Sequence, residues 1–313
     1  MAKVSCRKAF TSTLLEQARK DPDLWAVATD SRGSVTIGQF FQELPEQSVE
    51  LGIAEQNAVS AAAGIAATGK NVFVTGPACF LAARSYEQVK VDVAYNQSNV
   101  KVVGVSGGVS YGPLGGTHTS LHDIAGMRAL PNIEVFVPSD AAQTRAVTRY
   151  MIGHTGPCYM RTGRGDVEGV YPENEEFGDV HKAKLVMDGT DVAIIACGEM
   201  VYFAKQAGEL LRGQGVRARV LDLCCLKPAD EAAIAAAARD TGAIVTVEEH
   251  SIFGGLGELV AHVAARECPV PVEILGFPDE EYKVGKNQEL FAYYGLTPEN
   301  IAARARAVME GKK

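Results

Sequence analysis

The sequence predicts an α/β protein of two domains, each a mostly parallel sheet flanked by helices. Short apolar segments alternate with amphipathic segments along most of the chain, a pattern typical of βαβ units. One acidic segment with Pro and Gly, D-V-E-G-V-Y-P-E-N-E-E-F-G-D, interrupts this pattern. The length of 313 residues suits two domains of about 150 residues each. We therefore predict a first domain over 1–168, a linker over 169–189 and a second domain over 190–313.

The first half of the chain should form alternating helices and strands. An amphipathic pattern predicts a first helix that ends before Asp21-Pro22, and an Ala-rich run predicts another helix after Glu55. The helices are expected at 5–20, after Glu55, at 85–94 and at 122–130. The strands are expected at 24–30, 71–76, 101–108 and 134–140, with a break at Pro138, and a further strand begins at Pro157.

After the acidic segment the same alternation resumes. Strands are expected at 191–198, 217–226 and 243–250. Helices are expected at 201–212, 230–239, 255–266 and 298–309. This second run of βα units indicates a second, separately wound sheet.

Composition excludes several functional classes. The net charge of -8 and the pI near 5.4 argue against a nucleic-acid surface. No apolar stretch reaches the length of a spanning helix, and the N-terminus has no apolar signal region, so we expect no membrane partner and a cytoplasmic protein. The seven cysteines show no repeated C-x-x-C spacing and are interpreted as small apolar core residues in a reducing compartment.

Polar and aromatic residues cluster just after the predicted strands, where α/β sheets bind ligands. Asp30, Ser31 and Ser34 follow the first strand, and Phe80, Arg84 and Tyr86 follow the second. The Gly-rich segment G-V-S-Y-G-P-L-G-G-T-H-T-S, with His118, follows the third, and Arg161 and Arg164 follow the strand at Pro157. The topology predicts a common mouth for these loops.

Glu55 is the one charge in the run from Leu51 to Gly69. One interpretation is an N-terminal helix carboxylate that the macrodipole favours, and the other is a buried catalytic carboxylate. His118 likewise suits either a surface turn or a catalyst, and the two arginines suit a solvated strand end. His118 and His122 are four residues apart, but without a third nearby ligand they do not predict a metal site.

Together these motifs resemble the transketolase family, specifically its pyrimidine-binding domain followed by its C-terminal domain. The segment G-I-A-E-Q-N-A-V-S-A-A-A-G resembles the one whose glutamate contacts the pyrimidine of thiamine diphosphate, and C-F-L-A-A-R-S-Y-E-Q-V resembles the aromatic segment of that pocket. G-G-T-H-T-S-L-H-D-I-A-G-M-R-A-L-P-N-I-E-V-F-V-P-S-D, V-L-D-L-C-C-L-K-P-A-D and Y-Y-G-L-T-P-E-N-I extend the resemblance, in order, over nearly the whole chain.

The resemblance implies a role for each candidate residue. Glu55 would share a proton with the cofactor pyrimidine, and an apolar site that raises the pKa of a carboxyl would assist this. Phe80 would stack on the pyrimidine, Tyr86 would line the same pocket, and Asp30 and Ser31 would approach the thiazolium. The substrate residues would be His118, which binds the sugar oxygen, and Arg7, Ser34, Arg164 and Arg161, which bind the phosphate.

Three positions depart from the family pattern. Ala83 stands where many transketolases have a second aromatic, Leu114 stands where they have an aspartate, and Ser106 stands where they have a phosphate-binding histidine. The resemblance leaves the role of Arg84 open. Because two of the changes remove polar contacts from the substrate channel, we expect a donor or acceptor other than the usual pentose phosphates, such as a branched or sulfonated sugar.

The diphosphate-binding motif of the family, G-D-G … N, does not occur in this sequence. The resemblance therefore implies a split enzyme in which a separate N-terminal subunit holds the diphosphate and Mg²⁺ or Ca²⁺, in an α2β2-like assembly, while this chain holds no metal. The expected activity is transfer of a two-carbon ketol unit from a ketose phosphate to an aldose. R-T-G-R-G keeps a 1-deoxyxylulose-5-phosphate-synthase-like or 2-oxo acid dehydrogenase β-like subunit open. A non-catalytic scaffold subunit is the remaining alternative.

Overall fold

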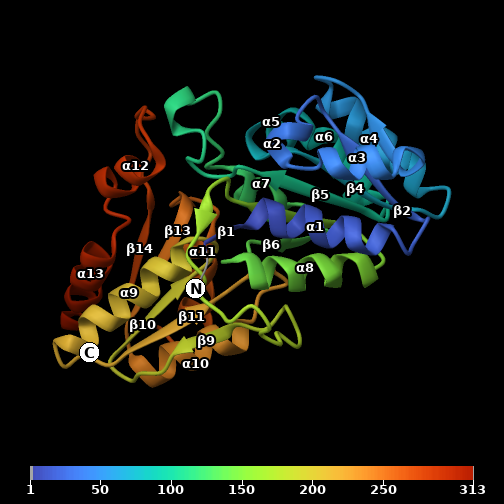
Figure 1. The fold of residues 1–313 in the computed structure, drawn as a ribbon. Helices are drawn as coiled ribbons and strands as arrows, with labels where there is room; N and C mark the ends of the chain where they lie inside the picture. The colour runs from blue at the N-terminus through green and yellow to red at the C-terminus, as the bar shows by residue number, and fades with distance from the viewer. Residues whose placement is uncertain (1–2, 313) are drawn as a thin grey trace.

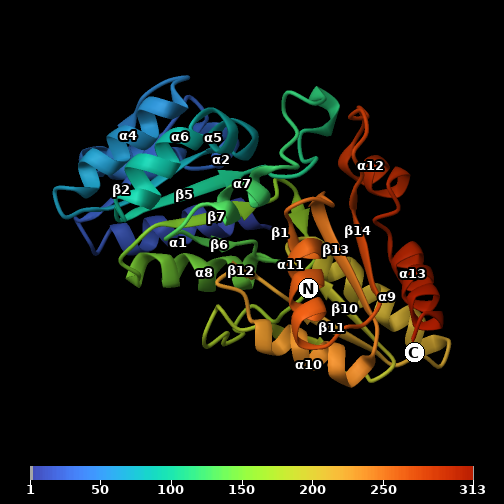
Figure 2. The ribbon, with the colours of Figure 1, turned by 180° about the vertical axis from the view of Figure 1, so that it is seen from behind.

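The computed structural model describes residues 3–312, and these form two α/β domains that lie side by side (Figure 1). Each contains one main sheet with helices on both faces (Figure 2). The predicted fold class, two mostly parallel sheets flanked by helices, is confirmed.

The first sheet has seven strands in the order β12-β6-β7-β5-β4-β2-β3. Its strands run over β2 (Leu24–Ala28), β3 (Ser48–Glu50), β4 (Asn71–Pro77), β5 (Val100–Val105), β6 (Glu134–Phe136), β7 (Cys158–Thr162) and β12 (Cys225–Lys227). All neighbours are parallel except β12, which pairs antiparallel with β6. A short ribbon, β1 (Val4–Ser5) with β8 (Asp166–Val167), joins the start and end of this domain.

Helices cover both faces of the first sheet. Those on one face are α1 (Cys6–Ala18) and α8 (Ala141–Gly153), which pack together (Figure 1). The remaining helices of the domain are α2 (Arg32–Val35), α3 (Gly38–Glu43), α4 (Glu55–Ala66), α5 (Ala78–Arg84), α6 (Tyr86–Gln88) and α7 (Asp123–Ala129). The helix predicted over 85–94 is α6 followed by a π-helical segment, Val89–Tyr95.

The second sheet has five strands in the order β14-β13-β10-β11-β9. Its strands are β9 (Lys184–Met187), β10 (Val192–Ala196), β11 (Ala218–Asp222), β13 (Ile244–Ser251) and β14 (Val272–Phe277), and only β9 is antiparallel to its neighbour. Its helices are α9 (Met200–Gly213), α10 (Glu231–Thr241), α11 (Leu256–Glu267), α12 (Asn287–Tyr293) and α13 (Pro298–Glu310). The packed pairs are α9 with α13 and α10 with α11.

The single strand predicted over 217–226 is wrong. The chain leaves the second sheet after Asp222, the last residue of β11, and enters the first sheet three residues later as β12. Leu223, Cys224 and the first two residues of β12, Cys225 and Leu226, are all apolar and buried, so hydrophobicity alone carries no signal for the switch.

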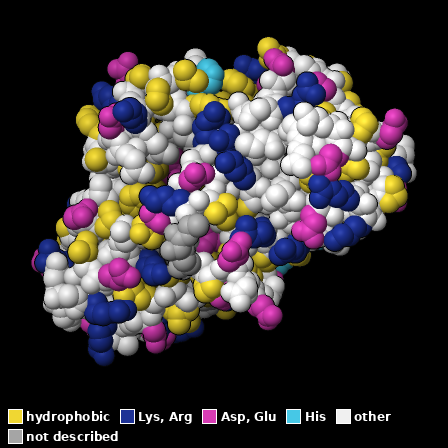
Figure 3. Space-filling model, viewed as in Figure 1, with side chains coloured by type: hydrophobic (Ala, Val, Ile, Leu, Met, Phe, Trp, Pro, Cys, Tyr) yellow, Lys and Arg dark blue, Asp and Glu magenta, His cyan; other side chains and the backbone are white. Residues whose placement is uncertain are grey.

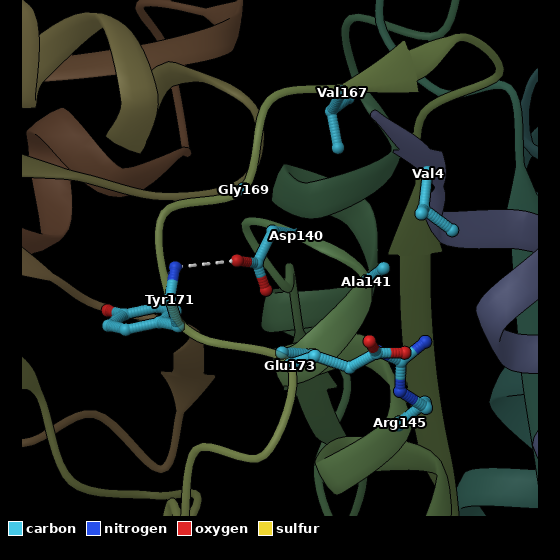
Figure 4. A pocket seen from close by; sticks show the side chains of 9 residues that line it. Val4, Asp140, Ala141, Arg145, Val167, Gly169, Tyr171 and Glu173 are labelled. Atoms are coloured by element: carbon cyan, nitrogen blue, oxygen red, sulfur yellow. Dashed lines mark hydrogen bonds and ion pairs between the residues drawn. The ribbon is translucent and has the colours of Figure 1, made fainter. Parts of the chain in front are cut away.

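The acidic segment after Asp166 packs against the first domain and is not a free linker. Asp140 caps α8 through the Gln143 N–H, and its other oxygen accepts the backbone N–H groups of Val170 and Tyr171, each at 2.9 Å. A pocket of about 290 Å³ lies beside this contact (Figure 4). The linker is therefore tied to the first domain by a helix cap, and β9, within the range predicted as linker, already belongs to the second sheet.

Two general features bear on function. No helix in residues 3–312 is long and apolar enough to cross a membrane. On the face shown in Figure 3, basic and acidic side chains lie intermixed over both domains.

Candidate functional site

A pocket of about 420 Å³ lies where β2, β3, β4 and β5 end, at the carboxyl edge of the first sheet. Segments after these four parallel strands supply its walls, as expected for a ligand site in an α/β fold. The lining residues are Thr29, Asp30, Ser31, Ser34, Ile53, Glu55, Pro77, Phe80, Arg84, Tyr111, Leu114 and His118. The pocket therefore gathers three of the four loops that the prediction brought together, whereas Arg161 and Arg164 of the fourth loop are not among the lining residues.

Glu55 is the first residue of α4 and is only 3% exposed. Both of its carboxylate oxygens accept hydrogen bonds from Arg84 Nη1, at 3.2 and 3.1 Å. The helix N-terminus and the guanidinium both favour the charge, which explains how a lone carboxylate is buried in an Ala-rich segment. Both interpretations of Glu55 thus apply to its position: it begins a helix, and it faces the pocket.

Helix α5 places Phe80 and Arg84 one turn apart on the same face. The Arg84 guanidinium carbon lies 4.1 Å above the centre of the Phe80 ring, in a cation–π contact. Arg84 therefore makes two contacts at once, one with the open face of the Phe80 ring and one with the carboxylate of Glu55. The contact with Glu55 is not predictable from the sequence, because nothing in it pairs residues 55 and 84, whereas the contact with Phe80 follows from the i,i+4 spacing.

His118 lies in the Gly-rich loop and packs edge-on against two aromatic rings. Its ring centre is 5.1 Å from that of Phe80 and 5.8 Å from that of Tyr111. Its Nδ1 is 2.8 Å from the Thr117 hydroxyl, which leaves Nε2 without a hydrogen-bond partner among the described residues. Tyr111 is a site residue that the sequence reasoning missed, although it stands in the same Gly-rich segment as His118.

Two arginines, Arg7 and Arg164, lie next to the pocket, where they contact the lining residues Ser34 and Tyr111 without lining the pocket themselves. Arg164 Nη1 donates to the Tyr111 hydroxyl at 2.5 Å, and Arg7 Nη1 donates to the Ser34 carbonyl. Burial, and then the nearby charge of Arg164, lower the pKa of Arg7. Two guanidinium groups that repel each other beside a pocket are a candidate site for an anion, because a phosphate dianion would relieve the repulsion.

Several polar atoms at the base of the pocket lack a partner within residues 3–312. The hydroxyls of Thr29 and Ser31 are buried without a hydrogen bond. Asp30 adopts a left-handed conformation with φ of 51°, and its N–H donates to Glu50 Oε1 at 2.6 Å. Unpaired buried hydroxyls cost folding free energy, so their presence in the pocket wall favours a polar ligand there.

Two predicted site residues lie elsewhere. The Tyr86 hydroxyl donates to the Gly126 carbonyl at 3.1 Å, and its ring lies against α7, outside the pocket lining. Arg161 is inside β7 instead of after it, is 3% exposed, and donates to the Glu249 carbonyl at 2.6 Å. Arg161 thus ties the first sheet to β13 of the second domain, and the structure does not bring it to the pocket.

One group of possible metal ligands occurs within residues 3–312, and it is far from the pocket. Donor atoms of Glu134, His154 and Cys158 lie within 4.8 Å of one another. Glu134 and Cys158 begin β6 and β7, so this group lies at the amino edge of the sheet, opposite the pocket. The Tyr150 hydroxyl already bridges Glu134 and His154, at 2.9 and 3.2 Å.

The fold and the pocket define a class of protein: two α/β domains with a cofactor-sized cleft at the carboxyl edge of the first sheet. Residues 2–169 match the family model of the transketolase pyrimidine binding domain, and residues 181–301 match that of the transketolase C-terminal domain. The chain belongs to the transketolase family, which confirms the resemblance.

Relatives of similar length carry specific names. The chain is 56% identical over 303 residues to one of the subunits of the apulose-4-phosphate transketolase of Phocaeicola vulgatus, covering 96% of both chains. It is 39% identical to the 6-deoxy-6-sulfo-D-fructose transketolase subunit of Clostridium sp. strain MSTE9, covering 98% of this chain and 95% of that one. A solved split-gene transketolase, an inactive β4 tetramer, is 35% identical, with a TM-score of 0.90 and full coverage of both chains.

The residues of the pocket fit the pyrimidine half of thiamine diphosphate, the cofactor that this family implies. Glu55 offers a buried carboxylate for a ring nitrogen, Phe80 offers a flat apolar face, and the free hydroxyls of Thr29 and Ser31 offer polar partners. Arg84 covers the first two of these features and has to move away for the ring to bind. No diphosphate-binding motif of the family occurs in the chain.

Proposed function

We propose that this chain is the pyrimidine-binding subunit of a two-subunit, thiamine-diphosphate-dependent transketolase. The observation that carries the proposal is the pocket that gathers Glu55, Phe80 and His118 from loops after three parallel strands. The 56% identity to a relative whose name makes it one subunit of a transketolase supports the two-subunit assembly. The partner would supply the diphosphate site and a Mg²⁺ or Ca²⁺ ion, and an α2β2 tetramer is the expected stoichiometry.

Three residues of the pocket, Glu55, Phe80 and His118, have a role in the proposed reaction. Thiamine diphosphate, when bound, supplies the electron sink that cleaves a carbon–carbon bond next to a carbonyl group. Glu55 would hold a ring nitrogen of the pyrimidine and share its proton, and Phe80 would pack on the ring face. His118, with Nε2 free among the described residues, would hydrogen-bond the sugar oxygen at the reacting end.

The other end of the sugar would be bound through its phosphate. Arg7 and Arg164 offer two guanidinium groups, and Ser34 lines the pocket beside them. Arg164 is already oriented by Tyr111, so it is partly preorganised for a charge-assisted bond. The reactive carbonyl would then lie between the arginines and Glu55. A ketose phosphate fits this arrangement because it carries a phosphate for the arginines and a carbonyl for the cofactor end of the pocket.

The substrate we propose is a branched ketose phosphate of the apulose 4-phosphate type. Leu114 is 57% exposed at the pocket rim and Ile53 is 75% exposed, so the entrance is apolar where a hydroxyl-binding carboxylate is expected. Ser106 is fully buried and lies outside the pocket lining, so it offers no phosphate contact. An apolar rim favours a substrate that presents fewer hydroxyls on that side.

The experiment is reconstitution. The chain is co-expressed with a diphosphate-binding transketolase subunit, thiamine diphosphate and Mg²⁺ are added, and ketol transfer is assayed with apulose 4-phosphate, xylulose 5-phosphate and 6-deoxy-6-sulfofructose as donors. The proposal expects transfer by the pair and none by either protein alone, with apulose 4-phosphate the preferred donor. Decarboxylation of pyruvate with glyceraldehyde 3-phosphate, in place of ketol transfer, would favour the synthase alternative, and no turnover of any donor would favour a scaffold role.

A further inference from the structure

The loop that carries His118 is held by the second domain. Its residues, 107–120, run between β5 and α7, and both Figure 1 and Figure 2 show this loop standing away from the first sheet and beside the segment between β14 and α12. Within the loop itself, tight turns close the tip, such as those in which the Leu114 N–H donates to the Tyr111 carbonyl at 2.8 Å and the His118 N–H donates to the Gly115 carbonyl at 3.0 Å. Turns of this kind do not fix the position of a loop in space.

Both ends of the loop are fixed to β13. The Val109 N–H donates to Glu249 Oε1 at 2.9 Å, and the Ser251 N–H donates to the Leu121 carbonyl at 3.0 Å. Val109 and Leu121 are also buried in the same apolar cluster as Leu290 of α12. The base of the loop is thus part of the core of the second domain.

The tip is covered by residues 282–290 of that domain. A Cβ on Gly116 would come within 2.8 Å of the Tyr282 ring, and one on Gly115 within 3.3 Å of Val284. A Cβ on Gly112 would come within 2.4 Å of the Gly285 carbonyl, and the Gly285 N–H donates back to the Gly112 carbonyl at 3.4 Å. The glycines therefore let the segment Tyr282–Gly285 lie directly on the loop backbone.

We propose that the segment Tyr282–Gly285, which we term the clamp, is a positioning element for His118. Tyr282 covers Gly116, two residues before His118, and Val284 covers the glycine whose carbonyl accepts the His118 N–H. None of the clamp residues is among those that line the pocket, so the clamp acts through the loop residues His118 and Leu114 and not through the ligand. The C-terminal domain thereby gains a role in substrate binding, which rests on the proposed function.

The mechanism of the clamp is a reduction of loop motion. Tyr282 is 48% exposed and Val284 is 69% exposed, so their contact with the loop is a surface contact that a substitution removes without opening a core. A loop that loses its cover opens locally more often, and its amide protons exchange faster. A less ordered His118 pays more entropy on binding the sugar, so the sugar KM rises while binding of the cofactor ring, at Glu55 and Phe80, does not change.

The test compares Tyr282→Ala, Tyr282→Phe and the matched control Tyr293→Ala. Tyr293 is another exposed tyrosine of the same domain, but its ring packs against Tyr294. Hydrogen exchange of peptides over 107–121 is measured by mass spectrometry on the full chain, and KM and kcat are measured on the reconstituted pair. We expect Tyr282→Ala to speed exchange at 112–118 about tenfold and to raise the sugar KM about tenfold at unchanged thiamine diphosphate affinity.

Tyr282→Phe keeps the ring and should restore both values to those of the wild type, and Tyr293→Ala should leave both unchanged. The proposal that the clamp positions His118 would be overturned if Tyr282→Ala exchanged its amide hydrogens at the wild-type rate, or if exchange became faster while the sugar KM stayed unchanged. Its failure is distinguishable from failure of the proposed function: a wild-type pair without ketol transfer would overturn that function, while the exchange measurement would still decide whether the clamp orders the loop.

Discussion

Arg84 and Glu55 form an ion pair inside the candidate pocket, with 3.1 Å between Arg84 Nη1 and Glu55 Oε2. The guanidinium also lies on the Phe80 ring. The arginine therefore contacts both groups that we assign to the cofactor ring, and under this assignment cofactor binding would have to displace it. The affinity for thiamine diphosphate would then depend on Arg84, whose role the sequence left open.

The first prediction concerns this displacement. Arg84→Ala removes the competing cation, so the reconstituted pair should bind thiamine diphosphate about fivefold more tightly. This gain corresponds to the free energy of the exposed cation–π contact and the ion pair that binding would otherwise have to break. The measurement is titration calorimetry. Arg32→Ala is the matched control, since Arg32 also pairs with a glutamate, Glu50, and lies over a phenylalanine ring, Phe41. Weaker binding in Arg84→Ala would show that the arginine holds the ligand instead of competing with it.

The second prediction concerns the Glu55 carboxylate. Glu55→Gln keeps the shape and the hydrogen-bond acceptor but cannot exchange a proton, so ketol transfer by the reconstituted pair should fall about 100-fold or more. The unfolding transition should remain cooperative by circular dichroism. Glu43→Gln, a carboxylate that pairs with Arg19 and is not among the residues that line the pocket, should keep activity within about threefold. Retained activity in Glu55→Gln would favour the scaffold alternative.

The third prediction concerns specificity at the pocket rim. Leu114→Asp introduces a hydroxyl-binding carboxylate at an exposed position of the Gly-rich loop, so kcat/KM for xylulose 5-phosphate as donor should rise about tenfold relative to the branched donor, apulose 4-phosphate. Leu210→Asp, an exposed leucine of α9, should not change the ratio. Competition between the two sugars in one reaction measures the ratio directly, and an unchanged ratio in Leu114→Asp would remove this residue from the specificity argument.

The fourth prediction concerns pH and the carboxyl at the end of β11. Burial raises the pKa of Asp222 to about 7, against the hydrogen bonds that its Oδ2 accepts from Tyr171, Ser139 and Gln143. Its Oδ1 has no partner within residues 3–312, which suits a retained proton. The pKa of this carboxyl in the unfolded chain is about 3.9. Between about pH 4 and 7, Asp222 therefore keeps its proton in the folded state and loses it in the unfolded state. The contribution of Asp222 to the free energy of unfolding therefore falls as pH rises through that window.

Asp222→Asn cannot ionise and still accepts the three hydrogen bonds. The variant should gain stability over the wild type as pH rises from 4 to 7, by up to about 1.4 kcal/mol per pH unit, with a constant difference above that. Urea unfolding at a series of pH values measures it. Asp279→Asn, at an exposed position, should follow the wild-type curve. A difference between Asp222→Asn and the wild type that does not vary with pH would show that the folded carboxyl is ionised throughout.

Most elements were predictable because their periodicity is local. The strand at β4 and the helix at α4 follow from apolar runs bounded by Gly and polar residues, and the pocket follows from the rule that parallel strands present their carboxyl ends together. β14 was not predicted, because two prolines stand just before it and Glu273 and Gly276 interrupt its apolar residues, in P-V-P-V-E-I-L-G-F. The expected position of Arg161 was wrong because β7 continues through it to Thr162.

What the sequence could not predict are contacts between distant residues. The pairing of Arg84 with Glu55 depends on how α5 packs against α4, and the cover of Gly116 by Tyr282 depends on how two domains meet. Neither is encoded in a period or a motif, because each is decided by tertiary packing. The glycines of the His118 loop were visible in the sequence, but their reason, a close approach of the second domain, was visible only in the structure.

Strand β12 has a consequence for any attempt to divide this protein into modules. Because Cys225–Lys227 completes the edge of the first sheet beside β6, a fragment cut at the linker would lack one of its own strands. The uncovered β6 edge would offer unpaired backbone groups to other molecules, which favours aggregation of the isolated fragment. The polypeptide order and the folding units therefore do not coincide, and a gene fusion or truncation that retains the first sheet has to extend at least through Lys227.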